Sequence, residues 1–359
     1  MNRSVRWQKL ALSVLCVILA LVLIVMIFAT TYVHYLLGRL GRVDPDEEST
    51  LSTDDFATMT ETIDPSYTGE TVHQTDVSID ILPSTGPTEK PEDPKKGQVI
   101  NILLVGQDRR AGEPRQRSDA MILCTFNTVK KTITMTSFLR DSYVYIPGYG
   151  NNKLNAAYQL GGFSKLNETL AVNFGVHVDA NVEVDFGGFA DVIDLLGGVD
   201  ITLTAGEAKY MNENGNYDGR PVNWNLKAGK NHLNGMQALA YSRIRYVSTG
   251  TGTANDFGRT ERQRTVISAL LTAYKNKPLT QMLGLVDDIL PMVTTNMTDN
   301  EILNYVVTLF PMLASSTITT QSVPSSGTYT DRYISGIGSS LILDLPAIRS
   351  ELEKLFETE

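Results

Sequence analysis

The first apolar stretch of the chain is not interrupted by any charge. Residues 10–29 read LALSVLCVILALVLIVMIFA, an uncharged run of 20 residues, which matches the length that an α-helix needs to cross a bilayer. A cleavable signal peptide is the alternative, but its apolar core is only about 7 to 15 residues long and ends in an Ala-x-Ala-like site that this run lacks. We therefore expect a transmembrane helix with its flank over residues 10–37, after a short amino-terminal segment at residues 1–9.

Beyond residue 97 the period of the apolar positions changes several times. QVINILLVGQD at residues 98–108 is a continuous apolar run, as in a buried strand, and two β-branched segments follow around a turn at residues 127–131. Helical spacing is found in residues 163–175, 186–198, 234–242, 256–276, 278–293, 298–313 and 344–356, and strand patterns in 176–186, 199–204 and 317–323. We expect loops at residues 206–230 and in the polar stretch after residue 323. The alternation predicts an α/β fold, an α-β-α layered single domain with a central mixed β-sheet over residues 97–359.

Charge divides the chain into three parts. The first 43 residues hold five Lys or Arg and no acid, whereas residues 44–96 hold 14 acids and three lysines, in a chain of net charge −9. Because Lys and Arg favour the cytoplasmic side of a span, we expect residues 1–9 in the cytoplasm and the folded part outside, held at the cell membrane by a single pass. Residues 38–96, rich in Ser, Thr, Pro and acids, are expected to form a disordered linker.

Several familiar chemistries are missing from the sequence. Cys16 lies in the apolar run and Cys124 in a strand pattern, so neither has a plausible disulfide partner. The four histidines have no metal-ligand spacing. Neither a GxxxxGK[ST] phosphate loop nor a GxSxG elbow occurs. A zinc site, a P-loop nucleotide site and a serine hydrolase are therefore not expected, and without a DNA-binding motif we expect no nucleic-acid partner.

Arginine is concentrated at the start of one predicted helix, DFGRTERQR at residues 256–264. At about 100° per residue, Arg259 and Gln263 fall on the stripe of apolar residues that must face the core. Arg262 lies close to this stripe, and Arg264 points elsewhere. An inward arginine needs a partner, because an unpaired buried charge costs several kcal/mol or more. The partner could be a carboxylate of the protein or a phosphate of a ligand.

Other arginines also follow predicted strands. They are Arg110 and Arg117 between Asp108 and Asp119, Arg140 beside Asp141, and Arg243 with Arg245 in YSRIRY. Arg243 and Arg245 would project to one side if that segment is extended. Ligands of α/β sheets gather beyond the carboxyl ends of strands, and the planar guanidinium grips phosphate in a bidentate manner. Paired carboxylates beside arginines suit Mg²⁺, whereas surface solvation of the arginines and turn capping by Asp108 and Asp119 are the simpler alternatives.

Seven blocks in this order carry a family resemblance: GQDRR, RSDAMIL, SFLRDSYV, NNKLNAAYQLGG, VDFGGFADVIDLLGGVDI, LKAGKNHLNGMQALAYSRIRY and DFGRTERQR. Together they resemble the LytR-CpsA-Psr family of cell-envelope phosphotransferases over roughly residues 98–275. The resemblance implies transfer of a glycopolymer, such as a teichoic acid or a capsular polysaccharide, from a polyprenyl (pyro)phosphate carrier to peptidoglycan. It also implies partners at the membrane and a phosphodiester product.

The matching motifs carry family roles onto this chain. Asp108 and Asp119 are implied to hold Mg²⁺, with Mn²⁺ as an alternative. The implied pyrophosphate-binding set is Arg110, Arg117, Arg140, Arg243, Arg245, Arg259, Arg262 and Gln263. The catalytic group is expected to be Arg140, Asp141, Asp256 and Arg259, with either aspartate as a candidate base. Lys153 and Asn155 match a block near the site with no assigned role.

The chain departs from the family pattern in two places. Leu139 precedes Arg140 where the family usually has proline, and YVSTGTGTAN between Arg245 and Asp256 is longer than usual.

Two other functions would use the same residues: a binding module for polyprenyl phosphates or wall polymers, and a hydrolase of the carrier pyrophosphate with water as acceptor. The presence of both Asp108 and Asp119 favours catalysis over simple binding.

Overall fold

The computed structural model of the chain describes residues 35, 38–42, 71–82, 98–107, 115–214, 224–275 and 288–357. The predicted membrane helix at residues 10–29 lies outside these ranges, as do Asp108 and Arg110. None of the helices formed by the described residues has the length and hydropathy that a bilayer crossing requires.

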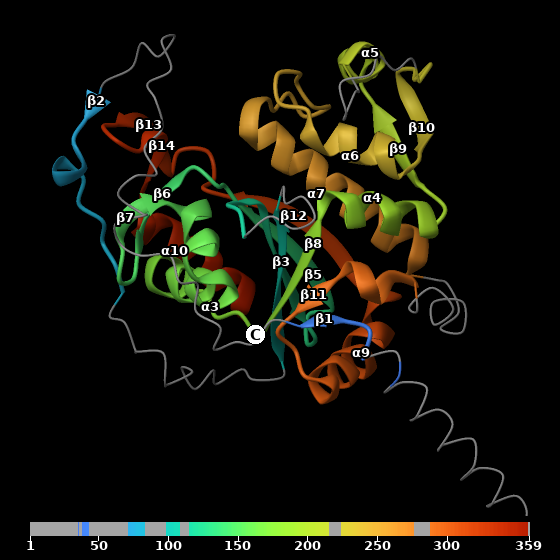
Figure 1. Cartoon of the computed structure of the whole chain (residues 1–359), viewed down its shortest axis with the longest axis horizontal. Helices are drawn as coiled ribbons and strands as arrows, with labels where there is room; N and C mark the ends of the chain where they lie inside the picture. The colour runs from blue at the N-terminus through green and yellow to red at the C-terminus, as the bar shows by residue number, and fades with distance from the viewer. Residues whose placement is uncertain are drawn as a thin grey trace, which may run out of the picture.

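A seven-stranded mixed sheet lies at the centre of the fold, with the strand order β1-β11-β8-β3-β4-β5-β12 (Figure 1). Its strands are β1 (Gly41–Arg42), β3 (Val99–Gln107), β4 (Ser118–Asn127), β5 (Thr132–Phe138), β8 (Ala180–Asp185), β11 (Thr294–Thr295) and β12 (Thr317–Val323). β4 runs antiparallel to both β3 and β5, while β3 is parallel to β8 and β5 to β12. The ends of β3, β5 and β8 and the start of β4 therefore share one edge. The predicted central mixed sheet is confirmed.

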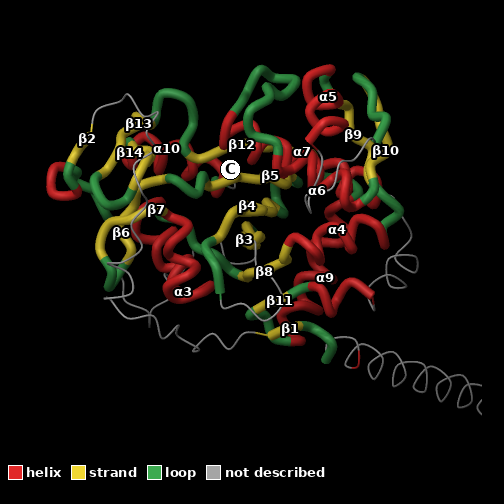
Figure 2. Tube along the Cα trace, turned by 45° about the horizontal axis from the view of Figure 1, so that its top comes forward, coloured by secondary structure: helices red, strands yellow, loops and turns green. Residues whose placement is uncertain are grey.

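Helices cover both faces of this sheet (Figure 2). On one face, α3 (Leu154–Phe174) and α10 (Leu345–Phe356) enclose a core that includes Leu103, Leu123 and Phe138. On the other face, α7 (Asn255–Tyr274) packs over Ile122 and Met135. α9 (Asp299–Leu313) follows the short 3-10 helix η2 (Leu290–Met292). Residues 288–289, just before η2, are also helical, so 288–292 is the described helical part of the segment predicted at 278–293. The layers agree with the predicted α-β-α arrangement.

A smaller group of elements packs on the outer side of α7. It contains α4 (Phe186–Leu195), β9 (Val199–Leu203), α5 (Ala205–Asn214), β10 (Gly229–Leu233) and α6 (Gly235–Arg243). Its apolar cluster includes Val266 of α7, so α7 is shared between this group and the central sheet. The prediction of a loop over residues 206–230 is wrong for α5 and β10. In α5 only Ala208 and Met211 supply buried apolar side chains, too few for a helical period to be seen in the sequence.

A second sheet has the order β2-β13-β14-β6-β7. Its strands are β2 (Thr71–Val72), β6 (Ser142–Ile146), β7 (Gly150–Lys153), β13 (Tyr329–Ile334) and β14 (Gly338–Leu343). The polar stretch after residue 323 therefore forms a hairpin, not the predicted loop. The pattern hid this because only two side chains of β13, Tyr333 and Ile334, are buried.

The expected disordered linker at 38–96 also needs correction. Residues 71–82 add β2 and a short 3-10 helix, η1 (Gln74–Asp76), and Ile79 packs against two core clusters. The carboxylate of Asp80 lies 3.3 Å from the Arg349 guanidinium of α10. β1 adds a further pairing from residues 41–42. The folded part of the chain thus includes segments that precede residue 97, held by strand pairing, an ion pair and a few apolar contacts that average composition does not reveal.

Candidate active site

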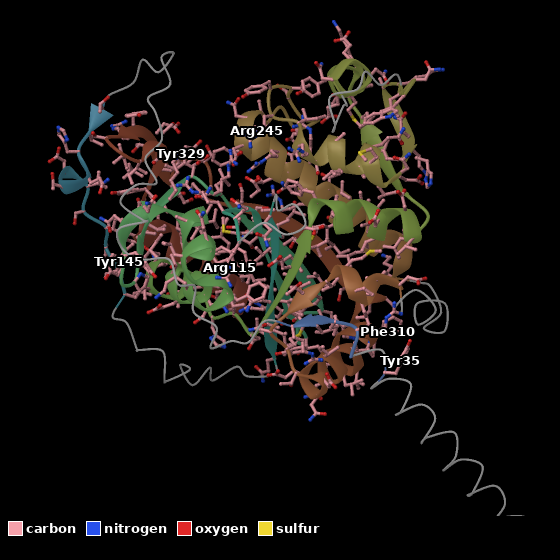
Figure 3. The ribbon with its side chains drawn as sticks, viewed as in Figure 1. Tyr35, Arg115, Tyr145, Arg245, Phe310 and Tyr329 are labelled. Atoms are coloured by element: carbon pink, nitrogen blue, oxygen red, sulfur yellow. The ribbon has the colours of Figure 1, made fainter. Side chains whose placement is uncertain are left out.

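A cluster of arginines and carboxylates lies at the edge where β4 begins and β5 ends. The antiparallel register that pairs Ile122 with Ser137 brings Asp119 of β4 towards Arg140, which follows β5. The cluster also receives Lys153 from the end of β7, Arg245 from the connection after α6, and Asp256 and Arg259 from the first turns of α7. In Figure 3, Arg245 lies beside α6 and α7, and Arg115 lies beside α3. Six residues from five places in the sequence thus meet at one site.

Arg140 is the centre of the ion-pair network. Its Nη1 lies 2.5 Å from Asp119 Oδ1, and its Nε lies 3.6 Å from Asp141 Oδ2 and 3.7 Å from Asp256 Oδ1. Lys153, which is almost completely buried, places Nζ 3.3 Å from Asp141 Oδ1. Asp141 therefore contacts two cations, Arg140 and Lys153, and Asp119 and Asp256 each contact Arg259 as well.

Arg259 approaches the same carboxylates from α7. Its Nη2 lies 3.0 Å from Asp256 Oδ1 and donates a 3.0 Å hydrogen bond to the backbone carbonyl of Asp119. Its Nη1 lies 3.5 Å from Asp119 Oδ1. Arg245 completes the group, with Nε 3.9 Å from Asp256 Oδ1. The expectation that Arg259 points inward holds, and its protein partners are Asp256 and Asp119.

The network affects the two central arginines differently. Burial opposes the charge of Arg140, but the three surrounding carboxylates outweigh it and raise the pKa of the guanidinium above its ordinary value. Burial is the main reason that the pKa of Arg259 is lowered; Asp256 opposes this effect, and the charges of Arg140 and Arg245 add to it. Both groups remain cationic at neutral pH because the shifts start from a very high ordinary value.

Several buried polar atoms of the cluster have no hydrogen-bond partner among the described residues. They are Nε of Arg140, Nε of Arg259, Oδ1 of Asp256, Oδ1 of Asn155 and Oε1 of Gln263. Native proteins rarely leave buried polar groups unsatisfied, since each one costs about 1–3 kcal/mol. The two guanidinium nitrogens are donors that an anionic ligand could satisfy. Among the described residues, the cations of the cluster (Arg140, Lys153, Arg245 and Arg259) exceed its three carboxylates by one.

The structure gives Arg262 a different environment from the one expected for a pyrophosphate ligand. Its side chain is 0% exposed, and its Nε lies 2.7 Å from Oε1 of Glu207, which is 1% exposed. Its terminal nitrogens donate to the backbone carbonyls of Ile244 and Val247 at 3.1 and 2.6 Å. We therefore remove Arg262 from the proposed ligand set, because an internal ion pair occupies it. Sequence reasoning missed Glu207, which lay in a predicted loop.

Two other arginines also differ from their expected positions. Arg243 is the last residue of α6, so the extended YSRIRY segment is not formed, and its guanidinium lies 4.8 Å from the ring centroid of Phe186. Arg264 is buried instead of pointing away from the core, and burial lowers its pKa to about 10. The helical period assigned Arg264 to the wrong side because α7 is covered by the central sheet on one side and by α6 and β9 on the other.

Buried polar contacts hold together the ends of β3 and β8 beside the cluster. Gln107 at the end of β3 and Tyr158 of α3 both donate hydrogen bonds to the buried carboxylate of Glu183 on β8. Gln107 also accepts a 3.1 Å hydrogen bond from the backbone of Gln116, next to the half-buried Arg117. A polar pocket of about 350 Å³ lies beside Glu183 and Asp185. Gln107 thus ties the segment that carries Arg117 to the sheet edge.

Buried guanidinium donors at the end of a central α/β sheet, without hydrogen-bond partners in the described part of the chain, have the chemistry that suits phosphate groups. The chain belongs to the LytR_cpsA_psr family, whose family model matches residues 60–351. The resemblance seen in the sequence motifs is thereby confirmed.

Similar proteins carry two kinds of name. Regulatory protein MsrR of Staphylococcus aureus is 34% identical over 250 residues, which cover 69% of this chain and 71% of MsrR. The polyisoprenyl-teichoic acid–peptidoglycan teichoic acid transferase TagT of Bacillus subtilis is 35% identical over 227 residues, which cover 62% of this chain and 66% of TagT. The chain therefore resembles both a protein named as a regulator and one named as a transferase.

Solved structures have the same fold. The structure of TagT bound to LIIa-WTA gives a TM-score of 0.58 at 29% identity and covers 76% of this chain and 96% of TagT. The structure of the family protein YwtF (TagT) with bound octaprenyl pyrophosphate lipid gives 0.55 at 28% identity, covering 75% and 94%. Relatives with this fold have thus been seen with a wall-polymer ligand and with a pyrophosphate lipid.

Proposed function

We propose that this protein is a phosphotransferase that moves a glycopolymer from a polyprenyl pyrophosphate carrier to peptidoglycan, leaving a phosphodiester bond. The observation that carries the proposal is the pair of buried Nε donors of Arg140 and Arg259, which lie among carboxylates without a hydrogen-bond partner in the described residues. The transferase name of TagT and the pyrophosphate lipid in the structure of YwtF (TagT) support the same reading.

The cationic side chains would bind and orient the pyrophosphate. Arg140, Arg245 and Arg259 offer planar donors that stabilise the phosphate charge, which grows on the bridging oxygen as the carrier phosphate leaves. An acceptor sugar hydroxyl attacks the transferred phosphorus; one P–O bond forms, and the bond to the bridging oxygen breaks. The hydroxyl proton passes to water or to a carboxylate, for which Asp141 and Asp256 are candidates. Positioning and electrostatics supply most of the rate in such transfers.

The carboxylates of the cluster also fit Mg²⁺. Carboxylate oxygens are the donors that Mg²⁺ prefers, and the ion needs only one or two of them because phosphate oxygens and water complete its shell. Asp119 would hold the ion together with Asp108, which lies outside the described residues. The excess of one positive charge in the cluster is smaller than the charge of a pyrophosphate, so a divalent ion would complete the neutralisation. Within the described part of the chain, no three His, Cys, Asp or Glu side chains form a metal site by themselves.

We place this activity at the outer side of the cell membrane. The proposal rests on the uncharged run at residues 10–29 and on the positive residues before it. A domain outside the membrane would meet both the lipid carrier and the peptidoglycan.

The test is to follow the phosphate of the substrate. The full-length chain in detergent micelles is incubated with Mg²⁺, a polyprenyl pyrophosphate-linked glycan labelled at the sugar-proximal phosphate, and peptidoglycan oligomers. The proposal predicts label on the peptidoglycan sugar. Label released to water as a glycan phosphate would instead indicate a hydrolase, and lipid binding without any movement of label would indicate a binding module. Asp119→Asn is expected to raise the Mg²⁺ concentration needed for half-maximal transfer by about tenfold.

A further inference from the structure

Arg245, which belongs to the cluster of arginines and carboxylates, lies on the connection between α6 and α7. This connection spans residues 244–254 and contains the glycine- and threonine-rich stretch STGTGTA at residues 248–254. A long connection of glycine and threonine residues would normally be mobile, and a mobile connection would place Arg245 poorly. The contacts of two neighbouring residues of α7 prevent this.

Arg262 binds the first part of the connection. Its guanidinium donates to the carbonyls of Ile244 and Val247, the residues that bracket Arg245 closely on both sides. Its third contact is the buried carboxylate of Glu207 on α5, 2.7 Å from Nε. The orientation of the guanidinium is therefore fixed by α5, and the backbone on either side of Arg245 is fixed by the guanidinium.

Glu261 binds the second part of the connection. Its carboxylate accepts hydrogen bonds from the hydroxyls of Thr251 at 2.8 and 2.9 Å and of Thr249 at 3.2 Å. The backbone closes on itself, with Thr249 donating to the Thr253 carbonyl at 2.7 Å and Gly252 donating to the Thr249 carbonyl at 3.0 Å. Two of the three threonines of the connection, Thr249 and Thr251, thus donate to one carboxylate.

A missing side chain allows this close approach. A Cβ atom at Gly258 would lie 2.8 Å from the Thr253 carbonyl oxygen and 3.2 Å from Nη1 of Arg262. Neither neighbour has free space, because the first is backbone and the second is held by carbonyls and by Glu207. Gly258 therefore lets the connection and the guanidinium meet on the surface of α7.

We propose that Arg262 and Glu261 are positioning residues that lock the 244–254 connection onto α7 and so hold Arg245 beside Asp256. The inference rests on the proposed function only in taking phosphate as the ligand of Arg245. It changes the expected role of Arg262 from binding the pyrophosphate to orienting a residue that does.

The test is a double-mutant cycle between the lock and Arg245. The full-length chain in detergent micelles is titrated with farnesyl pyrophosphate, and binding is measured by calorimetry. The paired replacement Arg262→Met with Glu207→Leu removes the contacts that Arg262 makes with the connection. It leaves no buried charge alone, and cores tolerate such a change well. Arg245→Ala is expected to weaken binding by about tenfold, and the paired variant by a similar factor. The two changes together should weaken binding no more than either alone.

The result that overturns the inference is independence of the two changes. If Arg245→Ala weakens binding by its full factor in the paired variant, or if the paired variant binds as the unaltered chain does, Arg262 does not act through Arg245. A merely destabilising effect would be seen in both backgrounds and would not depend on whether Arg245 is present.

A second variant does not depend on the buried pair or on any ligand. Glu261→Ala is expected to speed hydrogen exchange at the amides of Thr249 and Gly252 by about tenfold or more, whereas Glu353→Ala, an exposed acid of α10, should not. Unchanged exchange in Glu261→Ala would overturn its part of the inference. If the unaltered chain fails to bind farnesyl pyrophosphate, the proposed function fails, and the exchange measurement still decides whether the lock exists.

Discussion

Two arginines three residues apart on α7 are expected to differ in how much unfolding free energy is lost when each is replaced by methionine. Arg262 contacts Glu207, and Arg259 contacts Asp119 in the cluster of arginines and carboxylates. Methionine keeps most of the apolar volume and removes the charge in each case. The comparison therefore separates a structural charge from a functional one within a single helix.

The expected loss for Arg262→Met follows from the burial of its partner. Glu207 has a 1% exposed side chain and would lose its only cationic partner among the described residues. Breaking one half of a buried pair costs about 3–5 kcal/mol of unfolding free energy. The carbonyls of Ile244 and Val247 also lose their donors, which places the expected loss at the upper part of that range.

Arg259→Met should behave differently, although its side chain is only 5% exposed. Burial and the charges of Arg140 and Arg245 disfavour the cation at this position. After its removal, Asp256 still has Arg140 and Arg245 within 3.7 and 3.9 Å. We expect the unfolding free energy to change by no more than about 1 kcal/mol, as is common when a functional group is removed.

The assay is urea denaturation of the full-length chain and both variants in the same detergent, followed by circular dichroism. Equal losses for the two variants, or a larger loss for Arg259→Met, would refute the separation of roles. A chain in which Arg262→Met is as stable as the unaltered protein would refute the reasoning about the buried pair.

Three further predictions concern residues outside the cluster. The hydrogen bond to Asp200 raises the pKa of His232. The stability that His232 contributes is therefore present below about pH 6.5 and is lost as the pH rises through the raised pKa. His232→Asn should lower the melting temperature at pH 5.5 and not at pH 9. Gly258→Ala should cost about 1–3 kcal/mol in urea denaturation, whereas Gly250→Ala, whose Cβ would meet only an atom at 4.0 Å, should not. Burial raises the pKa of Cys124 to about 12, so Cys124→Ala should keep full transfer activity in the phosphate assay, and a loss of that activity would contradict an inert thiol.

The central sheet could be predicted because its strands carry unambiguous local patterns. β3 is a continuous apolar run, and β4 and β5 are β-branched segments around a short turn. Burial on both faces leaves such strands with little choice of residue. The hairpin of β13 and β14 could not be predicted because β13 is mostly exposed or half-buried and shows no apolar pattern. The strand β2 could not be predicted because its partner, β13, lies far away in the sequence.

The arginines of the site could be nominated from the sequence, but their partners could not. The helical period placed Arg259 inward, and the structure brings it to Asp119, 140 residues away. The same period could not separate Arg262 from Arg259, because the two lie on neighbouring parts of one helix face. Only the position of Glu207, in a segment without an apolar pattern, distinguishes an internal pair from a ligand site.

The most direct measurement of the central claim is the mass of the peptidoglycan acceptor after reaction. The full-length chain, Arg259→Ala and Arg42→Ala, an arginine of β1 that pairs with Asp299, are each incubated with lipid-linked glycan, peptidoglycan oligomers and Mg²⁺. The account predicts a phosphoglycan adduct with the unaltered chain and with Arg42→Ala, and none with Arg259→Ala. An adduct of equal yield from Arg259→Ala, or no adduct from the unaltered chain across several wall polymers, would contradict it.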